Sequence, residues 1–434
     1  MIYYSLNHNA PKVSFQEALS KGLAPDKGLY FPNEINALSL DFFDQIENLD
    51  NVTIAYEAIK QFVGDEIPKQ DLIEIIKDVL CFDFPVVEVE NNIASLELYH
   101  GPTMAFKDVG ARFMARCLGY FNQNKTSEKI TVLVATSGDT GGAVASGFLG
   151  VDGVDVKILY PSGKVSDVQE KPLTTLGQNL TAFEVDGTFD DCQAMVKQAF
   201  LDDDFKAQYN LTSANSINIA RWLPQMFYFF FAYKQLKHLN KKLIFSVPSG
   251  NYGNICAGMM AQKLGLPIHH FVTGNNANAI VPEYLKSGEY QTKPSVQTIS
   301  NAMDVGAPSN FIRIQELHHH NFETLKNNLS GFSYSDDETF DAVSKLYKEN
   351  NYTADPHGAI GYLALKAYLK DKSDDFYGVF LETAHPIKFL PVMPKHIAEN
   401  MELPEQISKL MNLDKKSIKI KDYQEFKNTS LLIG

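Results

Sequence analysis

The chain has 434 residues, of which 44% are hydrophobic and 21% are charged, and this composition is typical of a folded soluble protein rather than a disordered one. Its 52 acidic residues outnumber 39 lysines and arginines, so the net charge of −13 at pH 7 argues against nucleic acid and anionic membranes as partners. The length predicts about two or three domains.

The sequence gives no sign of export, disulfides or a membrane span. The four cysteines lie far apart, with no CxxC pair, so we expect reduced and mostly buried thiols. The N-terminus lacks a basic region followed by an apolar one, and the longest uncharged apolar stretch, residues 222–233, has 12 residues and contains Pro224. Because a membrane-spanning helix needs about 20, we interpret this stretch as a buried core helix and expect a cytoplasmic protein.

The first part of the chain, residues 1–95, has a helical pattern, because apolar residues recur at steps of three and four between Phe43 and Leu80. From Leu96 onward, short β-branched runs alternate with helical stretches. The clearest runs are residues 130–134, 156–160, 181–185, 243–247, 268–272 and 379–381. Strands that alternate with helices predict an α/β fold with mostly parallel sheets and helices on both faces.

Ligand sites in such sheets form where strands end and helices begin. Four junctions of this kind occur, at residues 130–148, 156–171, 242–265 and 377–389. In the third junction, Gly250, Asn251, Gly253 and Asn254 precede or begin a helix, where free backbone N–H groups favour an anion. An ordinary strand-to-helix turn explains the same residues. The GxGxxG and Walker A motifs are both absent, which argues against NAD and ATP.

Lys107 stands after Met104-Ala105-Phe106 and before an amphipathic helical pattern. A lysine held among apolar groups loses its proton more readily and can act as a Schiff-base nucleophile. The alternative is an exposed lysine in the first turn of the helix, paired with Asp108. The residues themselves leave both interpretations open.

Two other patterns argue against familiar kinds of site. The run His318-His319-His320 has no carboxylate or cysteine at ligand spacing and no HExxH motif, so we expect a solvated helix face and no metal. No GxSxG motif is present, which argues against a hydrolase nucleophile elbow.

Together, ten segments resemble the threonine synthase family, which comprises pyridoxal-phosphate (PLP) enzymes of the tryptophan-synthase-β-like fold, called PLP fold type II. The resemblance is to the long form with an extra N-terminal domain, and it extends over nearly the whole chain. The segments are GLYFP (28–32), GDEIP (64–68), LELYHGPTMAFKD (96–108), TSGDTG (136–141), YPSGKVS (160–166), NSINIAR (215–221), SVPSGNYGN (246–254), SNAMDVGAPSN (300–310), ADPHGAIGY (354–362) and TAHPIKF (383–389).

The resemblance implies roles for residues at matched positions. Lys107 matches the lysine that forms the Schiff base with PLP, and Thr383 matches the hydroxyl residue at the pyridine nitrogen. The residue before it, Glu382, is often glycine in the family, and we expect its side chain to point outward. The matched cradle for the cofactor phosphate consists of Gly250, Asn251, Tyr252, Gly253 and Asn254.

Substrate contacts are also implied. The TSGDTG turn matches the binding site of the substrate carboxylate, with polar groups from Ser137, Asp139 and Thr140. Three basic residues in matched segments are candidates for a clamp on the substrate phosphate, although each could equally be a surface ion-pair residue: Arg112, Lys164 and Arg221.

The resemblance implies a fold of two open, mostly parallel sheet domains and a helical N-terminal domain. We expect the N-terminal domain at residues 1–95, a large PLP-binding domain at 96–110 and 235–434, and a small domain at 111–234. The implied enzyme is a lyase of threonine biosynthesis, acting as a monomer or homodimer, that converts O-phospho-L-homoserine and water to L-threonine and phosphate. A related phospholyase that releases phosphate and 2-oxobutyrate is the enzymatic alternative, and a regulatory PLP-binding protein is the non-enzymatic one.

Overall fold

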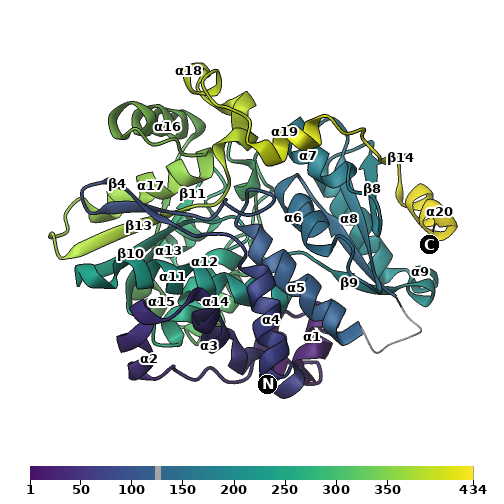
Figure 1. Ribbon diagram of the computed structural model, residues 1–434, viewed down its shortest axis with the longest axis horizontal. Coiled ribbons are helices and arrows are strands. Elements are labelled where there is room, and N and C mark those ends of the chain that lie inside the picture. Colours follow the sequence, from purple (N-terminus) through teal and green to yellow (C-terminus); the bar gives the residue numbers. More distant parts are fainter. Residues whose placement is uncertain (123–128, 434) are drawn as a thin grey trace.

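Two open sheets organise the computed structural model, which describes residues 1–122 and 129–433 (Figure 1). The larger sheet has six strands in the order β12-β11-β10-β13-β5-β4, and only β4 is antiparallel to its neighbour. Its strands are β4 (Val86–Glu90), β5 (Ile93–Glu97), β10 (Lys242–Pro248), β11 (Ile268–Asn275), β12 (Leu329–Ser333) and β13 (Phe376–Glu382).

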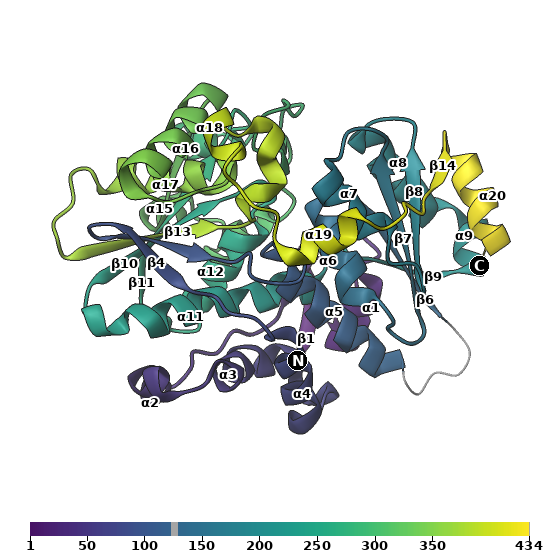
Figure 2. The same cartoon turned by 45° about the horizontal axis from the view of Figure 1, so that its top comes forward.

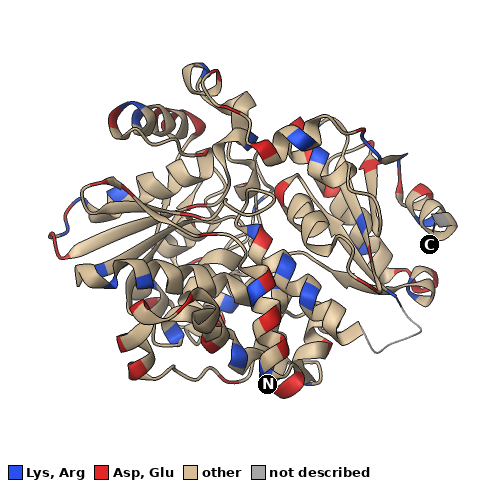
Figure 3. Cartoon of the chain, viewed as in Figure 1, with Lys and Arg blue, Asp and Glu red and all other residues tan. Residues whose placement is uncertain are grey.

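Both faces of the large sheet are covered by helices because its central strands are apolar on both sides. In β10, Ile244 packs with the apolar residues of α17 (Pro356–Leu369), whereas Phe245 belongs to the core cluster that includes α11 (Met226–Leu236) and α12 (Gly253–Lys263). This alternation follows the two-residue repeat of a strand. Charged residues lie mainly on the outer helices and loops (Figure 3). Further helices around this sheet are α13 (Ile280–Ser287), α14 (Phe311–Leu317), α15 (Phe322–Asn328) and α16 (Asp336–Asn350).

The smaller sheet has five parallel strands in the order β14-β8-β7-β6-β9. Its strands are β6 (Ile130–Ala135), β7 (Val154–Pro161), β8 (Leu180–Val185), β9 (Asn210–Ser213) and β14 (Ile418–Ile420). The helices around it are α5 (Lys107–Asn122), α6 (Asp139–Phe148), α7 (Asp167–Thr174), α8 (Phe189–Leu201), α9 (Asp203–Gln208), α10 (Ile219–Trp222) and α20 (Tyr423–Ile433). All six strands predicted from the sequence are present, and the mostly parallel α/β fold is confirmed.

The N-terminal region contains a small sheet that the helical pattern did not reveal. Three antiparallel strands, in the order β2-β1-β3, accompany the helices. The elements are β1 (Ile2–Ser5), β2 (Val13–Ser14), β3 (Tyr30–Pro32), α1 (Phe15–Lys21), α2 (Leu40–Gln45), α3 (Asn51–Val63) and α4 (Lys69–Val79).

The sheets divide the chain differently from the expected domain boundaries in two places. Strands β4 and β5 belong to the large sheet, so a boundary at residue 95 cuts through β5. The C-terminal segment crosses from the large to the small sheet through α18 (Lys395–Ala398) and α19 (Glu405–Met411), and β14 then pairs with β8 (Figure 2). Residues 418–433 therefore pack on the small domain, not the large one.

Several smaller predictions can be checked in the described residues. Residues 222–232 are buried in α10, α11 and the turn between them, as expected of a core helix. Cys117, Cys192 and Cys256 are buried and free, while Cys81 is exposed. The expectation of a solvated His318–320 face is wrong for His318, whose ring is buried and contacts the Ile314 carbonyl at 2.8 Å. No described helix is long and apolar enough to cross a membrane.

Candidate active site

Two segments almost 280 residues apart lie side by side between the sheets, and they bring Lys107 next to Thr383. The backbone N–H of Phe106 donates to the carbonyl of Thr383 at 2.9 Å, and the N–H of His385 donates to the carbonyl of Met104 at 3.1 Å. This short pairing follows the end of β13 and precedes the start of α5. Both Lys107 and Thr383 are therefore placed in one site by backbone contacts.

Lys107 is largely enclosed, with 17% of its side chain exposed. Its Nζ lies 3.9 Å from Oδ2 of Asp139, and it does not pair with Asp108, which accepts hydrogen bonds from the backbone and hydroxyl of Thr103 at 2.9 and 2.5 Å. Burial lowers the pKa of Lys107, and the Lys388 and Arg221 cations lower it further, while Asp139 raises it. The enclosed lysine is thus closer to a neutral amine than a surface lysine is.

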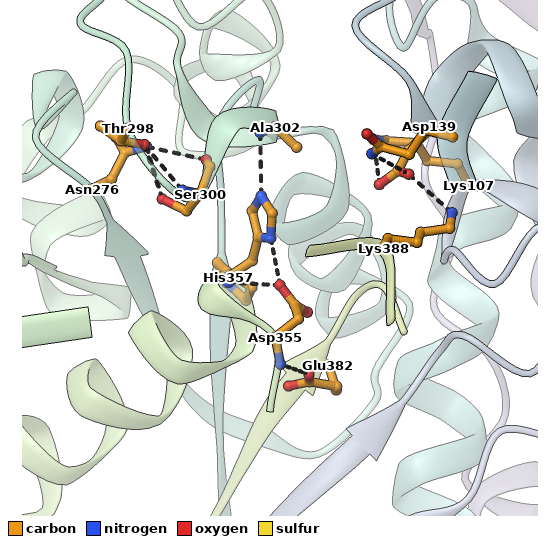
Figure 4. A network of polar contacts seen from close by, with 12 residues as sticks. Lys107, Asp139, Asn276, Thr298, Ser300, Ala302, Asp355, His357, Glu382 and Lys388 are labelled. Atoms are coloured by element: carbon orange, nitrogen blue, oxygen red, sulfur yellow. Dashed lines mark hydrogen bonds and ion pairs between the residues drawn. The ribbon is translucent and has the colours of Figure 1, made fainter. Parts of the chain in front are cut away.

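Asp139 begins α6 and links Lys107 to a second buried lysine (Figure 4). Its Oδ1 lies 2.9 Å from Nζ of Lys388 and accepts a hydrogen bond from Gln169 at 3.0 Å. Burial alone would raise its pKa, but the two lysines hold the pKa of Asp139 well below the usual range. One ionised carboxylate therefore lies between two lysines at this point.

The TSGDTG turn is organised by Thr136 at its start. The Thr136 hydroxyl accepts hydrogen bonds from the N–H groups of Gly138 at 3.0 Å and Gly141 at 2.8 Å. Ser137 and Thr140 stay half-buried on either side of Asp139, at the N-terminus of α6. The three predicted residues of this turn, Ser137, Asp139 and Thr140, are thus together at a helix start that suits a carboxylate.

The 249–254 loop joins β10 to α12 and has the backbone geometry of an anion cradle. A Cβ atom on Gly250 would lie 2.8 Å from the Ala302 carbonyl oxygen, so this position needs glycine. Among the described residues, no protein acceptor meets the backbone N–H groups of residues 250–253. Free N–H groups at the start of a helix favour a phosphate.

The larger side chains of the loop support its shape. Asn254 donates from Nδ2 to the Pro248 carbonyl at 2.9 Å and accepts from the Ser249 hydroxyl at 3.1 Å. Tyr252, which has a left-handed φ of 63°, donates from its hydroxyl to Asn275 at 2.7 Å. The Asn254 side chain therefore stabilises the start of the loop, and the Tyr252 side chain fixes the loop to the end of β11.

The three proposed clamp residues have different partners and exposure. Arg112 pairs with Asp78 of α4 at 3.2 Å, and Lys164 is exposed beside the start of α8, where it lowers the pKa of Asp191 after the stronger effect of the Thr188 hydrogen bonds. Arg221 alone is buried near Lys107, and burial lowers its pKa to about 10. The sequence could not show these differences in partner and burial, because they arise from tertiary packing.

Two residues of the site differ from the sequence-based expectation. Lys388, buried beside Asp139, was part of the quoted TAHPIKF segment but was not predicted as a site residue. Glu382 does not point outward: its side chain is completely buried and accepts a hydrogen bond from the backbone N–H of Asp355 at 2.5 Å. For both Lys388 and Glu382, the sequence signal of burial was a charged residue next to apolar residues.

Three family models match the chain. The model described as "Pyridoxal-phosphate dependent enzyme" matches residues 88–376, "Threonine synthase N terminus" matches residues 2–80, and "Threonine synthase, C-terminal" matches residues 358–429. Together these matches extend over most of the sequence, including the 249–254 loop and the TAHPIKF segment.

Individual relatives agree with the family models. Threonine synthase of Escherichia coli is 43% identical over 414 residues, covering 95% of each chain, and that of Saccharomyces cerevisiae is 35% identical, covering 96% of this chain and 94% of its own. The solved structure of the E. coli enzyme superposes with a TM-score of 0.92 at 41% identity over all of both chains. A PLP-bound threonine synthase from Brucella melitensis gives 0.92 at 33% identity, over 99% of this chain and 98% of its own.

Proposed function

This chain belongs to the threonine synthase family, and from that premise we propose that it converts O-phospho-L-homoserine and water to L-threonine and phosphate, with Lys107 as its reactive amine. The observation that carries the proposal is the pairing of residues 104–106 with 383–385, which places an enclosed lysine beside Thr383. The fold would otherwise be compatible with other PLP enzymes, since serine racemase of maize shares it at 16% identity and a TM-score of 0.54.

The residues present fit pyridoxal phosphate. Among the described residues, the backbone N–H groups of residues 250–253 have no protein acceptor. A Cβ atom on Gly250 would collide with the Ala302 carbonyl oxygen, and Lys107 provides an enclosed amine. When bound, PLP supplies an aldehyde for an amine and an electron sink for negative charge at the adjacent carbon. Gly250, Tyr252 and Gly253 would hold its phosphate through their backbone N–H groups.

Lys107 is suited to carry protons between carbon atoms of the substrate. Burial lowers the pKa of its amine and the nearby cations lower it further, which favours the neutral form of Nζ that accepts a proton from Cα. Asp139, 3.9 Å away, stabilises the ammonium form that results. The same Nζ would then return the proton to a carbon of the substrate.

The charges around Lys107 favour an anionic substrate. Lys388 and Arg221 contribute cations near Lys107, while Asp139 is the carboxylate paired with the two lysines. We assign the substrate carboxylate to the N-terminus of α6 at Ser137 and Thr140. Lys388 and Arg221 are the groups best placed to attract the substrate phosphate, and they replace Arg112 and Lys164 in our assignment.

Thr383 would face the ring nitrogen of the cofactor with a hydroxyl group. A hydroxyl partner does not force a proton onto that nitrogen as a carboxylate would, so it moderates the electron sink and helps to direct the reaction. Thr383 is 7% exposed, which limits competition from water for its hydroxyl.

The test is incubation of the purified, PLP-loaded protein with O-phospho-L-homoserine, with phosphate and threonine measured in the same samples. We expect equal molar amounts of the two products. Phosphate accompanied by 2-oxobutyrate instead of threonine would show that the chain is a phospholyase, and neither product would contradict the proposal.

A further inference from the structure

Two buried carboxyl groups that the steps above do not use meet at the N-terminus of α17 (Figure 4). Asp355 caps this helix, and its backbone N–H donates to Oε1 of Glu382 at 2.5 Å. Both side chains are completely buried. A Cβ atom on Gly358 would lie 1.5 Å from Oε2 of Glu382, so glycine at this position gives the carboxyl group access to the helix.

Asp355 has the donors that an ionised carboxylate needs. Its Oδ1 accepts hydrogen bonds from the backbone N–H of His357 at 2.7 Å and from Nδ1 of the same residue at 2.5 Å. The other ring nitrogen, Nε2, accepts from the backbone N–H of Ala302 at 3.2 Å, which places the ring proton on Nδ1. Asp355 is therefore the charged member of this contact, and His357 is neutral.

The surroundings of Glu382 favour its protonated form. Burial raises its pKa well above the usual range, and the charges of Asp355 and Glu97 raise it further. The other titratable groups that face it are Tyr99, after β5, and Tyr352, before α17, and burial raises the pKa of both phenols, so they stay neutral. Glu97 is the ionised neighbour, because hydrogen bonds from His100, Tyr99 and Tyr352 overcome the effect of burial and lower its pKa.

The two carboxyl groups each have an unused oxygen. Oε2 of Glu382 and Oδ2 of Asp355 are buried without a hydrogen-bond donor among the described residues. Two neighbouring buried carboxylates do not both ionise readily, so we expect one of the two to keep its proton. Because Asp355 already accepts from His357, the proton belongs on Glu382.

The contacts lead from this pair to the 249–254 loop. His357 holds the backbone of Ala302, and Ala302 in turn packs against Gly250, where a Cβ atom would lie 2.8 Å from its carbonyl oxygen. At the other end, Glu382 directly precedes Thr383. The chain of contacts thus joins the strand end at the proposed ring-nitrogen site to the proposed phosphate site.

We propose that Glu382 is a protonated positioning residue that donates a hydrogen bond to Asp355, and that the Glu382–Asp355–His357 chain fixes Ala302 against Gly250. The protonation of Glu382 follows from its burial, its contacts and the neighbouring charges, whereas its effect on the cofactor rests on the proposed function. A neutral Glu382 also keeps a second negative charge away from Thr383.

The protonation state is tested by infrared spectroscopy of the PLP-loaded protein at pH 7, with and without ¹³C-labelled glutamate. We expect a C=O band of an un-ionised carboxylic acid that shifts with the glutamate label, disappears in Glu382→Gln and persists in the matched control Glu97→Gln. Absence of a glutamate acid band in the unsubstituted protein, or its persistence in Glu382→Gln, would overturn the proposal. The measurement needs no substrate, so its result is separate from that of the product assay.

The positioning role is tested by the rate at which PLP is released into buffer that contains a PLP scavenger. Glu382→Gln keeps an N–H donor toward Asp355, so release should stay within about threefold of the unsubstituted rate, whereas Glu382→Leu, which has no donor, should release PLP roughly tenfold faster. Equal rates for the two variants would refute the role of the hydrogen bond. If Glu382→Leu does not fold, the infrared comparison still decides the proposal.

Discussion

Asp139 supplies one negative charge against two buried cations, Lys388 and Arg221, so the site keeps a positive charge available for an anion even when Lys107 is neutral. Lys388 and Lys107 come from segments that are 281 positions apart, and their meeting at Asp139 depends on how the C-terminal segment packs between the sheets. The sequence identified Lys107 and Asp139 through matched motifs. The sequence could not show that Lys388 pairs with Asp139, or that Arg112 forms an ion pair with Asp78.

At the residue scale, Lys388→Met should therefore impair the reaction and Lys164→Met should not. A charged hydrogen bond contributes about 1.5–3 kcal/mol, so we expect kcat/KM for O-phospho-L-homoserine to fall roughly ten- to a hundredfold without Lys388. Lys164 is exposed, so Lys164→Met should keep kcat/KM within about threefold of the unsubstituted value, as expected for a surface charge. A larger loss from Lys164→Met than from Lys388→Met would restore the original clamp assignment.

At the scale of elements, the junction between β10 and α12 sets how closely the backbone can approach a phosphate. Gly250 faces the backbone of the segment that contains Ala302 and Met303, where a Cβ would lie 2.8 and 2.9 Å from backbone atoms. At Gly253 the nearest atom to a Cβ is 3.4 Å away, in the side chain of Asn310. The two glycines of the loop are therefore not equivalent, although the sequence pattern treats them alike.

We expect Gly250→Ala to weaken PLP retention far more than its matched control, Gly253→Ala. Overpacking against backbone costs about 1–3 kcal/mol, which corresponds to a roughly five- to 150-fold weaker PLP affinity in a fluorescence titration. The PLP affinity of Gly253→Ala should stay within about threefold of the unsubstituted value, because the added Cβ makes only ordinary contacts. Equal affinities for the two variants would argue against a tight packing requirement at Gly250.

The elements that the sequence predicted are the ones with the strongest apolar pattern. Strands such as β6, β7 and β10 are buried on both faces and form continuous apolar runs, which fix their position in the sequence. Among the strands that the sequence did not predict, β9, β12 and β14 are short or partly exposed, and each lies at a sheet edge, whereas β4 and β5 lie at the end of the part expected to be helical. Their strand conformation depends on pairing with a neighbour, which local pattern does not report.

At the scale of the whole molecule, the C-terminal segment connects the large sheet to the small one. Helices α18 and α19 cross from the large sheet to the small one, and β14 adds to the edge of β8 (Figure 2). The resemblance to a family implied two sheet domains, but only the structure shows that residues 418–433 return to the small sheet. Local sequence pattern does not indicate that a C-terminal strand pairs with a strand far earlier in the chain.

Buried neutral histidines should make the folded protein sensitive to acid. Burial lowers the pKa of His270 to about 4, and its ring stacks on Tyr368. Since the unfolded chain binds the proton near pH 6.5, the unfolded state takes up a proton that the folded state excludes as the pH falls from 6.5 to 4. This one group can therefore cost about 3 kcal/mol of stability at pH 4.

The corresponding measurement is the thermal midpoint of His270→Asn and of the unsubstituted protein at pH 7 and pH 5. The variant should be less stable at pH 7 because it loses the buried ring, and the gap between the two proteins should narrow at pH 5. His319→Asn, at an exposed histidine, is the control and should show the same gap at both pH values. A His270→Asn gap that does not change with pH would show that His270 is not held neutral.

The most direct test of the central claim is to trap PLP on the protein with borohydride and to locate the label by peptide mapping. Lys107 and Lys388 both lie within 4 Å of Asp139, at 3.9 and 2.9 Å, so the site offers two enclosed amines. Because residues 104–106 pair with residues 383–385, we predict that the pyridoxyl group is found on Lys107. A label on Lys388, or on any other lysine, would contradict the account.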